Sequence, residues 1–148
     1  MKILLAIDDS RYSRIALCRV VQRHWPFGTE IKILTIIKPK EIIPRHSYAS
    51  GNDCQPFYEI ELKRAREIVD RAALEFKRKP VMVWTDVVVG SAEDEIFKAV
   101  QDWEPDLLVV GLRSLKGLIS LMLESISDKV AGFMPGSIEI FKDTAEAQ

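Results

Sequence analysis

Two acids and a serine follow the first apolar run of the chain, and their types allow two roles. Residues 3–7 are all apolar, and Asp8, Asp9 and Ser10 come directly after them. An acid pair after a first strand can hold Mg²⁺, as in receiver domains, but that chemistry also needs a phosphate-accepting Asp at the end of the third strand. Residues 88–90, where the third strand is expected to end, are Val-Val-Gly. The receiver hypothesis therefore fails, and a structural role, with Asp9 or Ser10 capping the following helix, stays open.

A second candidate site follows a later apolar run. Gly111 opens a seven-residue segment that carries a cation on each side of its centre, Arg113 and Lys116. The backbone N–H groups of such a loop, directly after a buried strand, can approach an anion. Ser125 can add a hydroxyl and the positive end of a helix dipole. The segment is not a Walker motif, because no Gly-Lys-Ser/Thr triplet has the right spacing. Phosphate binding and an ordinary turn both stay open.

The histidines and cysteines lack the spacing of a metal or catalytic centre. His24 and His46 have no second ligand at the sequence distances of zinc sites, and Cys18 and Cys54 form no Cys-x-x-Cys pattern. No Ser-His-Asp or Cys-His arrangement can be assembled. We therefore expect no catalytic residue and no metal site. The cysteines are most simply reduced thiols, with a single disulfide as the alternative.

Composition favours one soluble, globular domain. The 148 residues are 47% hydrophobic and 29% charged, with a net charge of −1. This charge gives no field that would attract nucleic acid or an acidic membrane. The chain has no run of about 18 apolar residues that could span a membrane, and its first apolar run is too short for a signal peptide. We therefore expect a cytoplasmic protein that binds neither nucleic acid nor membrane.

The pattern along the chain alternates strands with helices. Strands are expected at residues 3–7, 31–37, 81–89, 107–110 and 137–141, helices at 11–24, 62–76 and 93–102, a further helix after Ser125, and a long loop at 38–56. Such alternation implies parallel strands joined by right-handed crossovers, with helices on both faces of the sheet. The sequence thus predicts a doubly wound, five-stranded parallel α/β sheet, flavodoxin-like or closely related. Ligands of such sheets bind outside the carboxyl ends of the strands, where the strand order reverses.

Four stretches together resemble the universal stress protein family along nearly the whole chain. They are residues 3–8 with Ser10, residues 33–36, Gly90 with 95–96, and residues 106–111. The resemblance implies a fold of the adenine-nucleotide-hydrolase-like kind. It also implies a family domain at residues 1–142, followed by a C-terminal tail at 143–148.

The resemblance also implies a nucleotide site. ATP-binding members carry a glycine, two residues, a second glycine, nine residues, and then glycine with serine or threonine. Ile36 takes the place of the aliphatic residue whose backbone meets adenine. The positions that match define the candidate nucleotide-binding residues: Asp8, Ile36, Gly111, Arg113, Ser125 and Ser127.

Two of the three motif glycines are replaced, by Ser114 and by Glu124. A serine can adopt the left-handed turn of a glycine at about 1 kcal/mol. Glu124 places a carboxylate where the family presents bare backbone to phosphates. We therefore expect that binding of adenosine through Asp8 is retained even where binding of the triphosphate is lost.

The resemblance therefore predicts a binding or regulatory module in the stress response, with weak or absent ATP binding, rather than an enzyme. The ligand would be an adenine nucleotide, ATP or AMP with Mg²⁺. The alternative is a slow, Mg²⁺-dependent ATPase or nucleotide hydrolase, in which Glu124 would be a metal ligand. Family members are usually homodimers. Because residues from Ser137 to Phe141 are expected to form an exposed edge strand, we place the dimer contact there.

Overall fold

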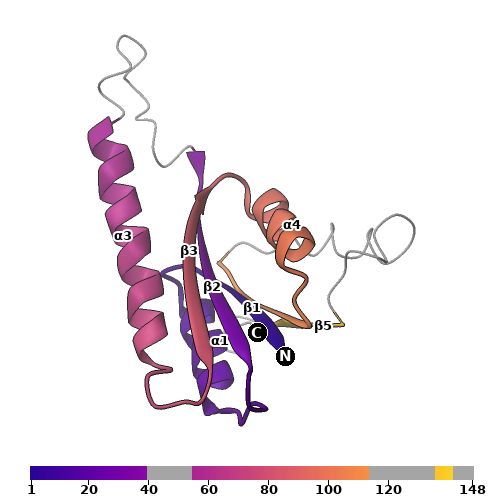
Figure 1. Ribbon diagram of the computed structural model, residues 1–148. Coiled ribbons are helices and arrows are strands. Elements are labelled where there is room, and N and C mark those ends of the chain that lie inside the picture. The colour runs from indigo at the N-terminus through magenta and orange to yellow at the C-terminus, as the bar shows by residue number, and fades with distance from the viewer. Residues whose placement is uncertain (40–54, 114–135, 142–148) are drawn as a thin grey trace, which may run out of the picture.

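The computed structural model describes residues 1–39, 55–113 and 136–141 of the chain. Their strands form one five-stranded sheet in the order β3-β2-β1-β4-β5, and every neighbouring pair is parallel (Figure 1). The strands are β1 (Lys2–Ile7), β2 (Glu30–Ile37), β3 (Met82–Val89), β4 (Leu107–Gly111) and β5 (Ser137–Ile140). The predicted doubly wound sheet is confirmed. The strand order differs from that of flavodoxin and is the related doubly wound order that the sequence analysis left open. The direction of the strand order reverses between β1 and β4.

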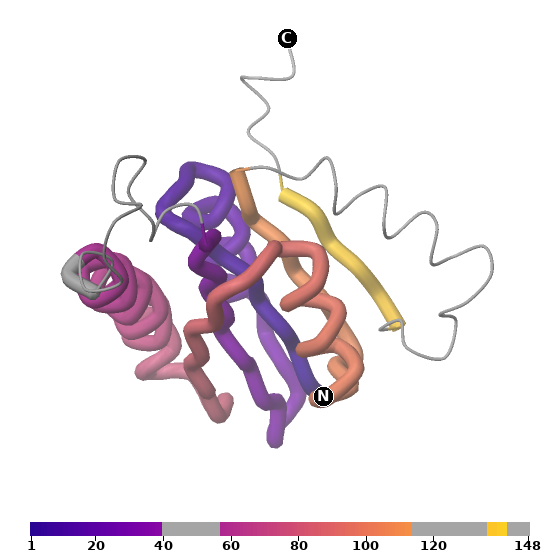
Figure 2. The backbone as a smooth tube through the Cα atoms, turned by 90° about the horizontal axis from the view of Figure 1, so that it is seen from above, coloured from indigo at the N-terminus to yellow at the C-terminus, as the bar shows by residue number. Residues whose placement is uncertain are grey.

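Helices cover both faces of this sheet, as Figures 1 and 2 show. The helices are α1 (Arg11–Gln22), α3 (Gln55–Leu74) and α4 (Ala92–Trp103). Side chains on β1 alternate, so that Ile3 and Leu5 join the core on the side of α1 and α3, while Leu4 and Ala6 join the core on the side of α4. A strand that is buried on both faces needs the continuous apolar sequence that residues 3–7 provide.

Helix α3 begins well before the stretch that the apolar periodicity predicted. Its inward-facing Ala65, Val69 and Ala72 are buried as expected, but the helix already starts at Gln55. The first turns rise beyond the end of the sheet in Figure 1, and Phe57 and Tyr58 there are exposed. Apolar periodicity marks only the part of a helix that packs on a core, so these turns left no such signal. The middle of the predicted 38–56 loop and the helix after Ser125 lie outside the described residues.

Strand β5 lies at one edge of the sheet. Its Ile138 and Ile140 pack with the core on the α4 side, as their alternation predicted. Glu139 faces the other side and accepts two hydrogen bonds from the guanidinium of Arg23, the first at 2.7 Å. These hydrogen bonds, and then the charge of Glu139, raise the pKa of Arg23 against the opposing effect of burial. This ion pair therefore ties the edge strand to the end of α1.

Candidate functional site

A pocket of about 420 Å³ opens at the carboxyl ends of the parallel strands. Its walls come from the ends of β1 and β2, the residue Arg113 after β4, and the middle of α3. The volume lies within the range of small-molecule sites, about 300 to 1,000 Å³. Three of the predicted site residues line it: Asp8, Ile36 and Arg113. The location is the one that doubly wound sheets use for ligands.

Asp8 holds together the two segments that border the strand-order reversal. Its Oδ1 accepts a hydrogen bond from the backbone N–H of Ser10 at 2.8 Å, and its Oδ2 accepts one from the backbone N–H of Arg113 at 2.9 Å. The hydroxyl of Ser13 lies 2.8 Å from Oδ1. A carboxylate offers about four lone-pair positions, so with respect to the described residues one position on Oδ2 stays available for a ligand. Asp8 therefore has a structural role and can still accept a further hydrogen bond.

Ser13 is a buried member of this network that the sequence analysis missed. Its Oγ accepts a hydrogen bond from the backbone N–H of Asp8 at 2.6 Å and lies within hydrogen-bonding distance of the carbonyl oxygen of Gly111. Ser10 caps α1 by accepting from the backbone N–H of Ser13 at 3.4 Å, which confirms one of the two predicted caps. The spacing Asp-x-Ser-x-x-Ser could have indicated Ser13. In a helix that begins after Ser10, the side chain at position 13 lies in the first turn, close to the end of β1.

Gly111 lies at the end of β4, where it is buried and pairs with Ile7. A Cβ at this position would lie 2.6 Å from the carbonyl oxygen of Tyr12 and 2.7 Å from the Cβ of Ala16. Its φ is not positive, unlike the φ of Gly28 and Gly90 among the described glycines. The close approach of α1 to β4 therefore accounts for this glycine without any ligand. Gly111 is not among the residues that line the pocket.

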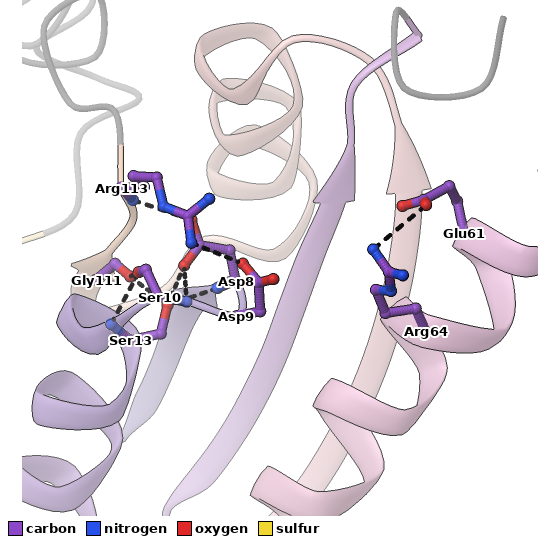
Figure 3. Close-up of polar contacts among 8 residues, drawn as sticks. All are labelled: Asp8, Asp9, Ser10, Ser13, Glu61, Arg64, Gly111 and Arg113. Carbon is purple, nitrogen blue, oxygen red and sulfur yellow. Dashed lines mark hydrogen bonds and ion pairs between the residues drawn. The ribbon is translucent and has the colours of Figure 1, made fainter. Parts of the chain in front are cut away.

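Two ion pairs face each other across the end of β2, as Figure 3 shows. On the β4 side, the guanidinium of Arg113 lies 3.3 Å from Oδ1 of Asp9. On the α3 side, the guanidinium of Arg64 lies 3.5 Å from Oε1 of Glu61. The sequence analysis did not include Glu61 and Arg64 in the site. Their spacing of three on one helix was visible, but nothing in the sequence placed that helix beside the pocket.

The other candidate positions fall outside this description. Ser125 and Ser127, together with the replaced glycine positions Ser114 and Glu124, lie outside the described residues. Within residues 1–39, 55–113 and 136–141, no group of three acids, histidines or cysteines could hold a metal ion.

Cys18 is free and exposed. No helix in the described part of the chain is both long and apolar enough to cross a membrane.

The fold and the pocket define an α/β protein with a pocket at the carboxyl ends of its parallel strands. The chain belongs to the universal stress protein family, whose model matches residues 1–136. The curated universal stress protein YxiE from Bacillus subtilis is 29% identical over 136 residues, which cover 88% of this chain and 90% of that protein. The predicted family is therefore confirmed.

Solved structures share the fold. A universal stress protein from Arabidopsis thaliana with AMP bound aligns at a TM-score of 0.66 and 16% identity, over all of this chain and 95% of that one. A universal stress protein in complex with cAMP aligns at 0.53 and 22% identity, over 96% of each chain. Identities this low establish the common fold.

Proposed function

We propose that this protein is a stress-response binding module whose pocket takes the adenosine part of a nucleoside monophosphate, and that it binds ATP weakly. The observation that carries this proposal is the pocket itself, where Asp8, as far as the described residues show, keeps one acceptor position near Ile36 at the end of β2. A ribose hydroxyl or a base amine can donate to that position. The two solved relatives named above hold AMP and cAMP, which are both monophosphates.

The charges of the pocket also favour a ligand of small net charge. Three acids and three bases line it, and so the described walls are neutral as a whole: Asp8, Asp9 and Glu61 against Lys38, Arg64 and Arg113. A triphosphate brings about four negative charges and needs a site that supplies an excess of cations or backbone N–H groups. The family motif has glycines where this chain has Ser114 and Glu124, and the loss of these glycines is expected to weaken the second source, which supports poor ATP binding.

Calorimetry with adenosine, AMP, IMP and ATP tests this proposal. We expect AMP to bind and ATP to bind at least about tenfold more weakly, a difference of about 1.4 kcal/mol. IMP has a carbonyl in place of the exocyclic amine. It should bind more weakly than AMP, because backbone carbonyl oxygens at the end of β2 can accept a hydrogen bond from the amine but not from a carbonyl. Tight ATP binding would contradict the proposal. Mg²⁺-dependent ATP hydrolysis would instead support the alternative enzyme.

We also propose a homodimer joined through β5, the strand that was predicted as an exposed edge. The backbone N–H groups of Ser137 and Phe141 donate to the β4 side, at 3.2 Å and 3.0 Å. Because N–H groups alternate along a strand, those of Ile138 and Ile140 point toward the edge that no described strand covers. A second copy can pair with them, since an unpaired edge offers free donors and acceptors.

Light scattering of two matched variants tests the dimer. The parent should have twice the chain mass of 16.9 kDa at micromolar concentration. Ile138→Pro should be monomeric, because it removes an outward N–H while it leaves the bonds to β4 in place. Ile138→Ala should stay dimeric, because it loses the same side chain but keeps the N–H. A monomeric parent, or a dimeric Ile138→Pro variant, would refute the contact.

A further inference from the structure

The ion pair between Arg23 and Glu139 lies at the edge strand where the dimer contact is proposed. Both carboxylate oxygens of Glu139, on β5, accept hydrogen bonds from the guanidinium of Arg23, the residue that follows the last turn of α1. The two side chains are 38% and 32% exposed. The pair is therefore ordered by two parallel hydrogen bonds and is still partly open to a second molecule.

Arg23 is also held in place by contacts other than Glu139. Its guanidinium lies 5.7 Å from the centre of the Trp25 ring, within the range of a cation–π contact. The ring nitrogen of Trp25 donates to the carbonyl oxygen of Val20 at 2.8 Å, and the backbone N–H of Arg23 donates to the same oxygen at 3.3 Å. These contacts fix the cation beside the edge strand before any partner binds.

The hydrogen-bonding groups of β5 favour one alignment of two copies. A two-fold axis normal to the sheet sets the two edge strands antiparallel and keeps their faces on the same side. Within β5, the outward groups are those of Ile138 and Ile140. If the axis passes at Glu139, Ile138 of each copy pairs with Ile140 of the other. An axis at either isoleucine would pair the other isoleucine with a residue beyond the strand.

This alignment brings like charges together. The two Glu139 residues would lie directly opposite each other in a non-hydrogen-bonded pair, with their Cα atoms about 4.5 Å apart. Like charges in such a pair destabilise a sheet. Both carboxylates would stand on the face of the sheet that carries α1, where the two copies of Arg23 also lie. The result is a neutral cluster of two carboxylates and two guanidiniums.

We propose that Arg23 permits the self-association of β5 by neutralising Glu139, and that the two residues set the register in which a second copy of this chain binds. This inference rests on the proposed homodimer and specifies its alignment and its charge requirement. A carboxylate offers about four acceptor positions and a guanidinium has five N–H donors, so Glu139 can also accept from Arg23 of the other copy. On the opposite face, Ile138 and Ile140 of the two copies form an apolar contact.

Cysteine cross-linking tests the register. In a chain with Cys18→Ser and Cys54→Ser, Glu139→Cys should give a disulfide-linked dimer under mild oxidation, because directly opposite positions lie within disulfide distance. Ile138→Cys and Ile140→Cys are the matched controls. Each would lie two residues from its own copy along the strand, with Cα atoms more than about 7 Å apart, and should cross-link poorly. Efficient linking of either control, with none at position 139, would overturn the register.

The dimer dissociation constant, measured by light scattering of a dilution series, tests the role of the charges. Arg23→Gln should raise it about tenfold, because the change leaves two carboxylates facing each other and occurs in both copies. Glu139→Gln should dimerise like the parent, and adding Glu139→Gln to Arg23→Gln should restore the dimer. Arg19→Gln, an exposed change on the same helix, should have no effect. If the pair only anchors β5 to α1, both single variants would weaken the dimer alike and the double variant would not recover.

Salt gives an independent check, and the outcomes separate the two proposals. Raising the salt concentration from about 0.1 M to about 1 M shortens the screening length from about 10 Å to about 3 Å, so it should strengthen the Arg23→Gln dimer. A dimer of this variant that does not respond to salt would refute the repulsion. A parent that is dimeric but does not cross-link through Glu139→Cys refutes the register alone. A monomeric parent refutes the homodimer, and this inference with it.

Discussion

Replacing Gly111 by alanine should lower the stability of the ligand-free protein by about 3 kcal/mol, which corresponds to a fall of roughly 10 °C in Tm for a domain of this size. The reason is steric. The added Cβ would lie 2.6 Å from the carbonyl oxygen of Tyr12 and 2.9 Å from the Cα of Ser13, and both are backbone atoms that cannot turn away. The first turn of α1 would have to move off β4. Thermal unfolding without nucleotide measures this effect.

Gly28→Ala provides the matched control. Gly28 has a positive φ of +85°, but a Cβ there would meet no atom within 4 Å. Its replacement should therefore lose only the conformational term of about 1 kcal/mol. If Gly111→Ala leaves Tm unchanged but weakens nucleotide binding, then Gly111 serves a ligand and the packing explanation is wrong.

This glycine shows where sequence reasoning reached its limit at the site. The resemblance placed Gly111 first in a phosphate-binding loop, and that position stays a prediction. The structure adds a reason for glycine that does not depend on any ligand, and it comes from α1, which begins 100 residues earlier. Such a contact depends on β1 and β4 being neighbours, and no local pattern encodes that adjacency. The same holds for the hydrogen bond between Asp8 and Arg113.

The strands were easier to predict than the pocket walls. Apolar or alternating patterns indicated each strand to within about a residue, and the continuous runs mark strands that are buried on both faces, such as β1 and β4. The first turns of α3 carry no apolar stripe, since they extend beyond the sheet with Phe57 and Ile60 exposed. Glu61 and Arg64 therefore gave no sign that they border a cleft. The strand order, which brings the candidate residues together, likewise could not be predicted from local sequence patterns.

Glu124→Gly should strengthen ATP binding by 10- to 100-fold, and Ser114→Gly should add a smaller gain. Both positions lie outside the described residues, so this prediction rests on the family motif. A carboxylate about 5 Å from a phosphate, at an effective dielectric constant of about 20, costs roughly 3 kcal/mol per phosphate charge before screening. Because about 1.4 kcal/mol is a tenfold change in affinity, the stated range allows for screening and for movement of the side chain.

Two comparisons separate charge from backbone freedom. Glu124→Gln removes the charge but keeps the side chain, so it should give most of the gain if repulsion is the cause. That gain should shrink with added salt, since exposed charges are screened within about 10 Å at 0.1 M. Ser114→Gly changes no charge, and its smaller gain should not depend on salt.

AMP serves as the comparison ligand for the charge at position 124. Glu124→Gly should raise AMP affinity much less than ATP affinity, because AMP brings fewer phosphate charges near position 124. Calorimetry of the parent and the variants, with and without Mg²⁺, measures both. A Glu124→Gly variant that binds ATP no better than the parent would refute the repulsion argument. If Mg²⁺ strengthens ATP binding to the parent and Glu124→Gly abolishes that effect, the carboxylate is a metal ligand and the enzyme alternative gains support.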